Sequence, residues 1–434
     1  MLARCNSRGL SVIYLLVLLL LLSNALAPSS ARAAENERGC KPGRPVEPIT
    51  LRVAFYPYTP DRIALFQMIE EIFECENPGV DVVLVSTKNA TKNYYSDDDA
   101  AKEGFRFVEA DVYEIDTILL ADFIAVGKIA TVELPFQDFA REAIEAVTRG
   151  GKIYGVPRWL CGNFLFYRKW DDEVRTARTW TELRSVLAAR KEGLFVDFKG
   201  KSTLGEWYLT ALSSSMGVDD AQKFVMSNSA LDSKAVIALQ EILAMCPLGF
   251  CRSSALHDRA GYYARAFVRG QAAAFVGYSE TIHYGLREAA DGCLPTSGCL
   301  RESDIAVRAL PQMQAGQSEP GVGWVDALAI DAGLPEDKKA LALAFVKRTV
   351  SEDAYSAILA PEWPYSARYL LPARRGITID KAPLYPAFLS AHQGRHTGTL
   401  KGLNKKLREA AKDLDCRLSI DRDDLETLKD CLAR

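Results

Sequence analysis

Short apolar segments alternate with segments that carry apolar residues at helical spacing through the first part of the chain. The pattern predicts strands at residues 51–55, 80–85 and 111–115, and helices after Asp61 and at 118–126. Asp61 is expected to cap the first of these helices. Strands and helices that alternate in this way predict a parallel α/β sheet covered by helices on both faces.

The rest of the chain is richer in helical patterns and ends in a charged segment. Cys161 is predicted to lie between two strands, and the tail from Lys401 onward is interpreted as a solvated helical element rather than a nucleic-acid arm. The other predicted elements are strands at 153–157, 163–168, 272–277 and 326–330, and helices at 180–190, 231–245 and 338–350.

The N-terminus has the pattern of a secretory signal peptide. Arg4 and Arg8 precede an apolar run at 12–22, which at about 11 residues is too short to cross a bilayer. Ala31-Arg32-Ala33 offers a cleavage site, with 25–27 as a second choice. An uncleaved signal anchor is the alternative. We therefore predict a secreted mature chain with no membrane-spanning segment.

Composition and charge exclude several classes of protein. The chain of 434 residues is 48% hydrophobic, which is ordinary for a globular protein and excludes a disordered chain. Lys and Arg number 53 against 56 Asp and Glu, so the sequence has no polycationic region for nucleic acid. Cleavage after Ala33 removes three arginines and no acidic residue, which leaves a mildly acidic chain. Only four histidines are present, which limits any metal site.

The cysteines suggest disulfide bonds with one thiol left over. Of the ten, Cys5 leaves with the signal peptide, and the nine that remain cannot all pair with one another. Spacing suggests four pairs out of about a hundred possible connectivities: Cys246 with Cys251, Cys293 with Cys299, Cys416 with Cys431, and Cys40 with Cys75. The unpaired residue is then Cys161. From the count alone, a small buried apolar side chain is the favoured explanation of Cys161.

Common catalytic and metal-binding motifs are absent from the sequence. It contains no phosphate-binding loop, no zinc-protease motif and no dinucleotide-binding glycine motif. Residues 277–281 begin like the nucleophile elbow of a serine hydrolase but lack its closing glycine. His392 and His396 are four residues apart with no further ligand nearby, so no metal site or cofactor is predicted.

Aromatic and acidic residues lie at the ends of several predicted strands. Tyr56 and Tyr58 follow the first strand, Asp116 follows the third, and Asp326 follows a turn that carries Trp324. In an open α/β sheet, ligands bind at the carboxyl ends of the strands. Each residue alone could equally pack at the rim or cap a helix. Together they predict a two-lobed protein that binds a small, flat, cationic ligand.

Four segments of the sequence resemble thiaminase I (thiamine pyridinylase), in the order of that family. They are residues 51–60, 154–169, 275–280 and 369–374, and the similarity extends from about residue 48 to 390. The resemblance implies a two-lobed type II periplasmic-binding-protein-like α/β fold with a ligand cleft between the lobes. It also implies cleavage of thiamine, in which another base such as pyridine or aniline replaces the thiazole through a covalent cysteine–pyrimidine adduct.

With this resemblance, the chain divides into six parts. They are a signal peptide at 1–33, a polar tether at 34–49, the first part of lobe 1 at 50–160, most of lobe 2 at 161–310, a return to lobe 1 with packing helices at 311–400, and a charged helical extension at 401–434. The extension and the additional cysteines depart from the bacterial pattern and suggest adaptation to secretion from a eukaryotic cell.

The resemblance also assigns roles to individual residues. Cys161 matches the nucleophile, Glu280 the acid/base carboxylate, and Asp116 and Asp326 the carboxylates that bind the pyrimidine. Tyrosines of the ligand cleft are matched by Tyr56, Tyr58, Tyr278 and Tyr262, the last with a spacing to Glu280 that is one residue short, and Trp324 stands where a tyrosine is expected.

Two other functions remain open at this level. A non-catalytic carrier of thiamine or another solute would have the same fold, although it would need neither Cys161 nor Glu280. A thiol hydrolase could pair Cys161 with His283, although no residue in the sequence is seen to orient that histidine. In each case we expect a monomer.

Overall fold

The computed structural model describes residues 47–419, apart from 57–58, 86–108, 229, 248, 294–297, 314, 317–320, 363–364, 378, 380 and 393–397. The predicted signal peptide, Tyr58, Cys40, Cys431 and His396 lie outside the described residues. In the part that is described, no helix is both long and apolar enough to cross a membrane.

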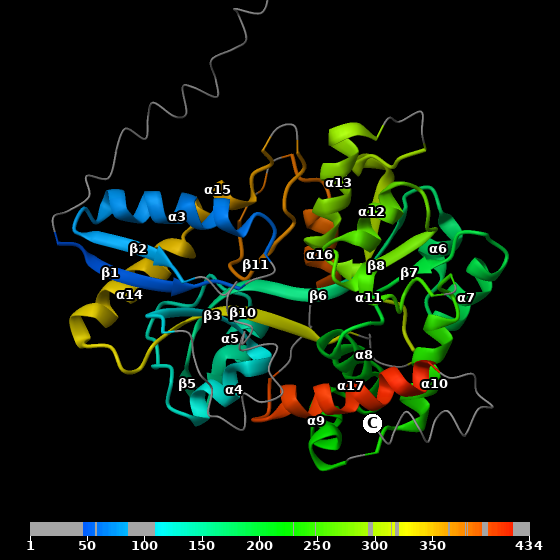
Figure 1. Cartoon of the computed structure of the whole chain (residues 1–434), viewed down its shortest axis with the longest axis horizontal. Helices are drawn as coiled ribbons and strands as arrows, with labels where there is room; N and C mark the ends of the chain where they lie inside the picture. The colour runs from blue at the N-terminus through cyan, green and yellow to red at the C-terminus, as the bar shows by residue number, and fades with distance from the viewer. Residues whose placement is uncertain are drawn as a thin grey trace, which may run out of the picture.

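One nine-stranded sheet runs through the molecule, with the strand order β2-β1-β3-β10-β6-β8-β7 and with β9 and β11 also paired to β6 (Figure 1). The strands are β1 (Ile49–Ala54), β2 (Val80–Leu84), β3 (Val112–Asp116), β6 (Val156–Arg168), β7 (Leu194–Phe195), β8 (Ala274–Tyr278), β9 (Ile305–Arg308), β10 (Gly323–Ile330) and β11 (Leu371–Pro372). A separate hairpin joins β4 (Thr148–Arg149) to β5 (Lys152–Ile153).

The prediction of a parallel sheet holds for the first three strands but not for the sheet as a whole, which is mixed. β1 is parallel to β2 and β3, and β7 is parallel to β8. In the middle, however, β10 runs antiparallel to both β3 and β6, and β6 runs antiparallel to β8. The sheet is mixed because a strand from late in the chain returns between strands formed much earlier, an arrangement that local sequence patterns do not reveal.

The strand β6 connects the two halves of the sheet. Its first part pairs with β10 and β11, and from Asn163 onward it pairs with β8 and β9. The prediction of two separate strands, with Cys161 between them, is wrong because residues 156–168 form one strand. Trp159 and Leu160, which the prediction left outside a strand, are buried parts of it.

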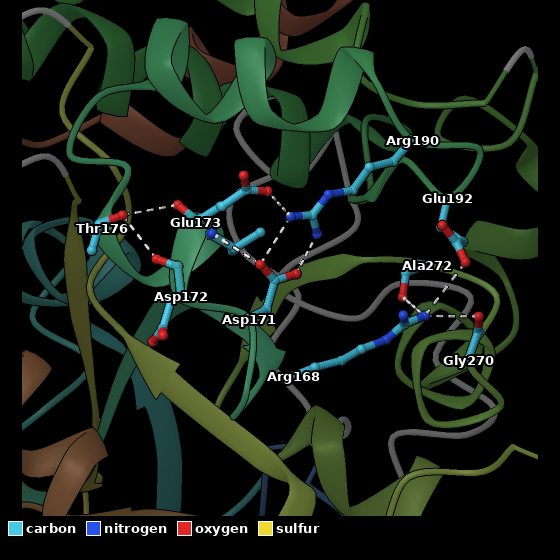
Figure 2. Close-up of polar contacts among 10 residues, drawn as sticks. Arg168, Asp171, Asp172, Glu173, Thr176, Arg190, Glu192, Gly270 and Ala272 are labelled. Carbon is cyan, nitrogen blue, oxygen red and sulfur yellow. Dashed lines mark hydrogen bonds and ion pairs between the residues drawn. The ribbon is translucent and has the colours of Figure 1, made fainter.

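The far end of β6 is fixed by polar contacts (Figure 2). The Arg168 guanidinium donates to the carbonyl oxygens of Gly270, at 3.1 Å, and Ala272, at 3.3 Å. Just beyond, Asp171 forms an ion pair with Arg190. The Arg168 contacts tie the end of β6 to the chain that leads into β8, and the Asp171 ion pair ties the next residues to the segment that follows Ala188.

Helices cover both faces of the sheet, as predicted, and each face has its own hydrophobic core (Figure 1). One core includes α3 (Arg62–Glu76), α12 (Tyr262–Val268), α13 (Thr281–Gly292), α14 (Glu336–Thr349), α15 (Glu352–Leu359) and α16 (Tyr385–His392). The other includes α4 (Thr117–Ala125), α7 (Trp180–Ala188), α8 (Lys201–Met216), α9 (Val218–Ser227), α10 (Ser233–Leu243) and α17 (Leu403–Ser419). The remaining described helices are α5 (Arg141–Val147), α6 (Asp172–Thr176), α11 (Ser254–His257) and the 3₁₀ turn Glu302–Asp304.

Two local predictions about helices need correction. Asp61 is the N-cap residue of α3, but its carboxylate makes no cap hydrogen bond and instead accepts from Arg287 Nη1 of α13 at 2.8 Å. The C-terminal helix α17 is solvated on one face only. Its other face buries Leu407, Ala411 and Leu414 and packs against α8, because the apolar residues of this charged segment recur at helical spacing.

The disulfide predictions are confirmed where the residues are described. Cys246 is bonded to Cys251 and Cys293 to Cys299. Cys75 and Cys416 are disulfide-bonded as well. Among the described cysteines, Cys161 is free. The unpaired thiol expected from the odd number of cysteines therefore lies in the central strand of the sheet.

Candidate active site

Cys161 lies where β6 changes its neighbours. On one side its register partner is Trp324 of β10, and two residues farther along, Asn163 pairs with Tyr278 of β8. Since alternate residues of a strand project to the same face, Cys161 and Asn163 share a face of β6. Side chains from both halves of the sheet therefore meet around this thiol.

The thiol group of Cys161 is surrounded by carboxylates. Its Sγ donates to Asp326 Oδ2 at 3.6 Å. Burial raises the pKa of Cys161 well above its usual value, and the negative charges of Asp326, Glu280 and Asp116 raise it further. Cys161 is therefore a neutral thiol at neutral pH, and it needs a proton acceptor or a nearby cation before it can act as a nucleophile.

Asp116 and Asp326 form a pair of buried carboxylates. They are register partners on the antiparallel strands β3 and β10. Burial, together with repulsion from Glu206, raises the pKa of Asp116 to about 7. Burial, followed by repulsion from Asp116 and Glu114, raises the pKa of Asp326. Asp116 also accepts from the Ile118 backbone N–H at 2.8 Å, so it caps α4 while it faces Asp326.

Glu280 is a third carboxylate of this cluster. It lies at the start of α13, two residues after the end of β8, and it accepts from Ser279 Oγ at 3.3 Å. Burial raises the pKa of Glu280 to about 7. A carboxylate that titrates near neutral pH can both accept and return a proton during a reaction.

Tyr56 is held at the site by a buried ion pair. Its backbone N–H donates to Glu114 Oε2 at 2.8 Å, and Arg158 Nη1 donates to Glu114 Oε1 at 2.7 Å. Both charged side chains are almost fully buried. The pKa of Tyr56 is raised by burial and then by Asp326 and Asp116, so its hydroxyl stays neutral and can donate a hydrogen bond.

Tyr278 reaches the same cluster from β8. Its hydroxyl donates to Glu206 Oε2, and Asn163 Nδ2 donates to Glu206 Oε1 at 2.8 Å. The pKa of Tyr278 is raised by burial and then by Glu206, with a smaller contribution from Asp116. Trp324 is buried on β10 beside Cys161.

The contacts described for Tyr262 do not bring it into the cluster. Tyr262 contacts the ring of Tyr263, at 5.7 Å between centroids, and the guanidinium of Arg259, so its place in the site stays a prediction. Tyr58 lies outside the described residues.

The two histidines considered in the sequence have other partners. His283 Nδ1 lies 3.2 Å from the carbonyl oxygens of Ser366 and Ala367, and Nε2 lies 3.6 Å from Asp61, so its polar contacts offer no link to Cys161. His392 Nε2 lies 3.3 Å from the backbone carbonyl oxygen of Cys161. Within the described ranges, no group of three or more His, Cys, Asp or Glu side chains could hold a metal ion.

Sequence reasoning missed four residues that support the site: Asn163, Glu206, Glu114 and Arg158. A signal existed for two of them. Asn163 is two residues from Cys161 in an apolar strand, and Glu114 is a charged residue inside a buried strand, where it requires a partner. Glu206 lies in a helix far along the chain, and no local pattern connects it to Tyr278.

Comparison with known proteins gives a consistent result over most of the chain. A family model described as the Thiaminase-1 domain matches residues 162–291, a range that begins one residue after Cys161 and contains Tyr278 and Glu280. Thiaminase-1 of Paenibacillus thiaminolyticus is 27% identical over 398 residues, which cover 86% of this chain and 86% of that protein.

Solved structures show the same fold. Thiaminase I from Bacillus thiaminolyticus superposes with a TM-score of 0.68 at 22% identity, covering 86% of this chain and 99% of that chain. Clostridium botulinum thiaminase I in complex with thiamin gives 0.67 at 19% identity, covering 85% and 98%. Maltose-bound MalE3 of T. maritima gives 0.63 at 17% identity, covering 88% and 98%. The chain is thus similar to thiaminase I along most of its length, and it has the two-lobed type II periplasmic-binding-protein-like fold that thiaminase I shares with sugar-binding proteins.

Proposed function

We propose that this protein is a thiamine pyridinylase, which transfers the pyrimidinylmethyl group of thiamine from the thiazole to another base through a covalent Cys161–pyrimidine intermediate. The observation that carries the proposal is the free Cys161 thiol, 3.6 Å from Asp326 and influenced by Glu280 and Asp116, in a chain similar to thiaminase I.

The charges of the site suit the thiamine cation. Asp116, Asp326 and Glu280 are buried together, and each has a raised pKa because water no longer stabilises its negative charge. A cation placed among them would favour their ionised forms. The rings of Tyr56 and Tyr278 and the indole of Trp324 would supply aromatic surface for a planar ring.

In the first step, the Cys161 proton passes to a carboxylate while Sγ attacks the pyrimidine ring carbon adjacent to the carbon that bears the methylene bridge. The new S–C bond pushes a ring electron pair toward a ring nitrogen, and an aspartate bound there would stabilise the electron-rich adduct. The bond between the methylene carbon and the thiazolium nitrogen then breaks. Its electron pair stays on the thiazole, which leaves as a neutral molecule.

In the second step, the incoming base adds to the methylene carbon. Glu280, with a pKa of about 7, can remove a proton from an acceptor such as aniline, or from water. The adduct then expels Cys161 as a thiolate, which restores the aromatic pyrimidine, and the thiolate recovers a proton from a carboxylic acid of the cluster. Protons and electrons balance without a metal or cofactor.

We also propose that the protein is secreted and acts as a monomer. Disulfide bonds persist in oxidising compartments, and the described chain contains several of them. The second candidate function is a carrier of thiamine or another solute, which the similarity of fold to the maltose-bound protein would permit. A carrier, however, has no need for a free thiol next to three carboxylates.

The test is thiamine consumption by the mature protein with and without pyridine or aniline, compared with Cys161→Ser. We expect consumption that the added base accelerates and that the variant lacks, together with a mass increase on Cys161 when the acceptor is withheld. Thiamine binding without turnover in both proteins would leave a carrier. Turnover that survives the substitution would mean that another residue is the nucleophile.

A further inference from the structure

One carboxylate links the two strands that carry the reacting groups. Glu206 of α8 accepts from Asn163 Nδ2 of β6 through Oε1 and from the Tyr278 hydroxyl of β8 through Oε2. Asn163 and Tyr278 are themselves register partners. Because each oxygen of the carboxylate has its own donor, the Glu206 side chain is held in one orientation and spans both strands.

The proposed catalytic residues lie only a few residues from Asn163 and Tyr278 in the sequence. Cys161 is two residues before Asn163 on the same face of β6, and Glu280 is two residues after Tyr278. Tyr278 also lies close enough to Tyr56 and Asp116 for their charges to raise its pKa. The position of the Tyr278 ring therefore bears directly on the space next to Cys161.

The helix that supplies Glu206 has little freedom to move. On either side of Glu206, Gly205 and Trp207 are buried, and Trp207 Nε1 donates to the Asp197 carbonyl oxygen at 3.1 Å. At Gly205 the helix α8 lies so close to α17 that a Cβ there would come within 3.0 Å of Leu407 Cβ. The packing of α8 therefore holds the backbone of Glu206 in place.

We propose that Glu206 is a positioning residue of the thiamine site, which holds the Tyr278 hydroxyl and thereby fixes the Tyr278 ring relative to Cys161 and the bound thiamine. This inference rests on the proposed function of the site. Through Oε2 the Glu206 side chain accepts the hydrogen bond that holds the Tyr278 hydroxyl. Asn163 has a supporting role, since its amide prevents the carboxylate from rotating.

The alternative is that Glu206 only packs α8 against the sheet. The two roles differ in how substitutions combine. If Glu206 acts through Tyr278, removing the Tyr278 hydroxyl leaves Glu206 with nothing to position, so the two changes should not add. If Glu206 has only a structural role, its loss should lower stability and affect activity independently of Tyr278.

The experiment compares Glu206→Gln, Tyr278→Phe and the double variant in thiamine consumption with aniline as acceptor. We expect each single change to lower kcat/KM by about 10- to 100-fold. The double variant should be no less active than the less active of the two single variants. Adding Asn163→Asp to Glu206→Gln moves the carboxylate from position 206 on α8 to position 163 on β6. The glutamine amide can then donate to the carboxylate introduced on β6 and accept from Tyr278, and we expect most of the activity to return.

Two controls keep the inference separate from the proposed function. Ser202→Ala removes a contact of the same helix, since Ser202 Oγ accepts from Arg408 Nη1 at 2.7 Å, and it should leave kcat/KM unchanged. Thiamine affinity, measured in a Cys161→Ser background, should show the same non-additivity between Glu206 and Tyr278 without any turnover.

The possible results then have distinct meanings. Multiplicative effects of the two single changes, or a Glu206→Gln variant with a lowered Tm and unchanged kcat/KM, would overturn the positioning role and leave the enzyme intact. If the wild-type protein binds thiamine but never consumes it, and the Glu206 and Tyr278 substitutions have non-additive effects on affinity, the enzymatic function is overturned and the positioning role is retained. A protein that neither binds nor consumes thiamine would overturn both.

Discussion

Asp116 and Asp326 face each other as register partners on the antiparallel strands β3 and β10, with Asp326 only 3% exposed. Like charges placed directly opposite each other on a sheet are unfavourable, and burial makes the repulsion stronger. Burial, with repulsion from Glu206, raises the pKa of Asp116 to about 7, and burial, followed by repulsion from Asp116, raises that of Asp326, so this part of the site favours protonated carboxyls. A bound cation would relieve the repulsion, which makes the pair suited to a positively charged ligand.

The first prediction concerns the reactivity of Cys161. Asp326→Asn removes the charge with the largest effect on the pKa of the thiol, so the pKa of Cys161 should fall and its alkylation at a fixed pH should become faster. The measurement is the pH dependence of iodoacetamide labelling, followed by mass spectrometry. Thiamine consumption should fall in the same variant, because the proposed pyrimidine contact is lost.

A matched variant for this prediction is Asp353→Asn, which removes an exposed carboxylate at the start of α15. It should leave the labelling rate unchanged. An unchanged rate in Asp326→Asn as well would show that Asp326 does not control the thiol.

The second prediction concerns the pH dependence of thiamine binding. Asp116 and Glu280 titrate near pH 7 in the protein without ligand, and a cation bound between them should lower both pKa values. Binding should therefore release protons and should tighten as the pH rises through about 7. Calorimetry of the Cys161→Ser variant, in buffers with different ionisation enthalpies, measures the number of protons released.

The same titrations set the sign of the effect on stability. Both pKa values are raised above their usual values, so the folded state binds more protons than the unfolded state between those values and pH 7. The contribution of these groups is greatest in acid and is lost as the pH rises through about 7. Glu280→Gln should reduce the number of protons released on binding, and a binding constant that does not vary with pH would contradict the electrostatic account.

Site residues could be predicted where the signal is local in the sequence, and not where it depends on segments that are far apart along the chain. Strand ends are visible in the hydrophobic pattern, so Tyr56 and Asp116 could be found before the fold was known. Asp326 was recognised, but it lies inside β10 rather than after a turn, and its pairing with Asp116 joins segments that are far apart in the sequence. The bridge from Glu206 to Asn163 and Tyr278 belongs to tertiary structure alone.

The sequence predicted the fold class, but not the order and direction of all the strands in the sheet. The helical periodicity gave helices on both faces of a sheet, whereas the direction of β10 and its place between β3 and β6 depend on long-range pairing. The continuity of β6 through Cys161 was missed for another reason. A central strand covered on both faces has no polar alternation, so its length cannot be judged from periodicity.

The third prediction concerns the buried pair that holds Tyr56. Glu114→Gln would leave the Arg158 guanidinium buried without its partner charge, and we expect a loss of about 3–5 kcal/mol in the free energy of unfolding. Denaturant titration measures the loss. Replacing both residues, as Glu114→Gln with Arg158→Met, should recover part of it because no unpaired charge then remains buried.

The comparison for this pair is Glu145→Gln, which breaks the exposed ion pair with Arg141 on α5 and should leave stability unchanged. The Glu114 variant should also raise KM for thiamine, since the glutamine has a single carbonyl oxygen for the two donors, Arg158 and the Tyr56 backbone N–H. A stable Glu114→Gln protein would show that Arg158 finds other acceptors.

The last prediction concerns the contact between α8 and the C-terminal helix α17. Gly205→Ala would ordinarily stabilise a helix interior by about 1 kcal/mol. Here the new Cβ would lie 3.0 Å from Leu407 Cβ and 3.1 Å from the Leu407 carbonyl oxygen, so the two helices must separate. Overpacking of this kind costs about 1–3 kcal/mol, and we expect net destabilisation in a denaturant titration.

Two further variants test whether this contact is the cause. Gly79→Ala places a methyl group where no atom lies within 4 Å, so it should not be destabilising. Adding Leu407→Ala to Gly205→Ala should not restore stability, because the close atoms of Leu407 are its Cβ and its backbone. Since Glu206 is the next residue of α8, displacement of this helix should also lower kcat/KM, and a stabilised, fully active Gly205→Ala protein would show that α17 does not press on α8.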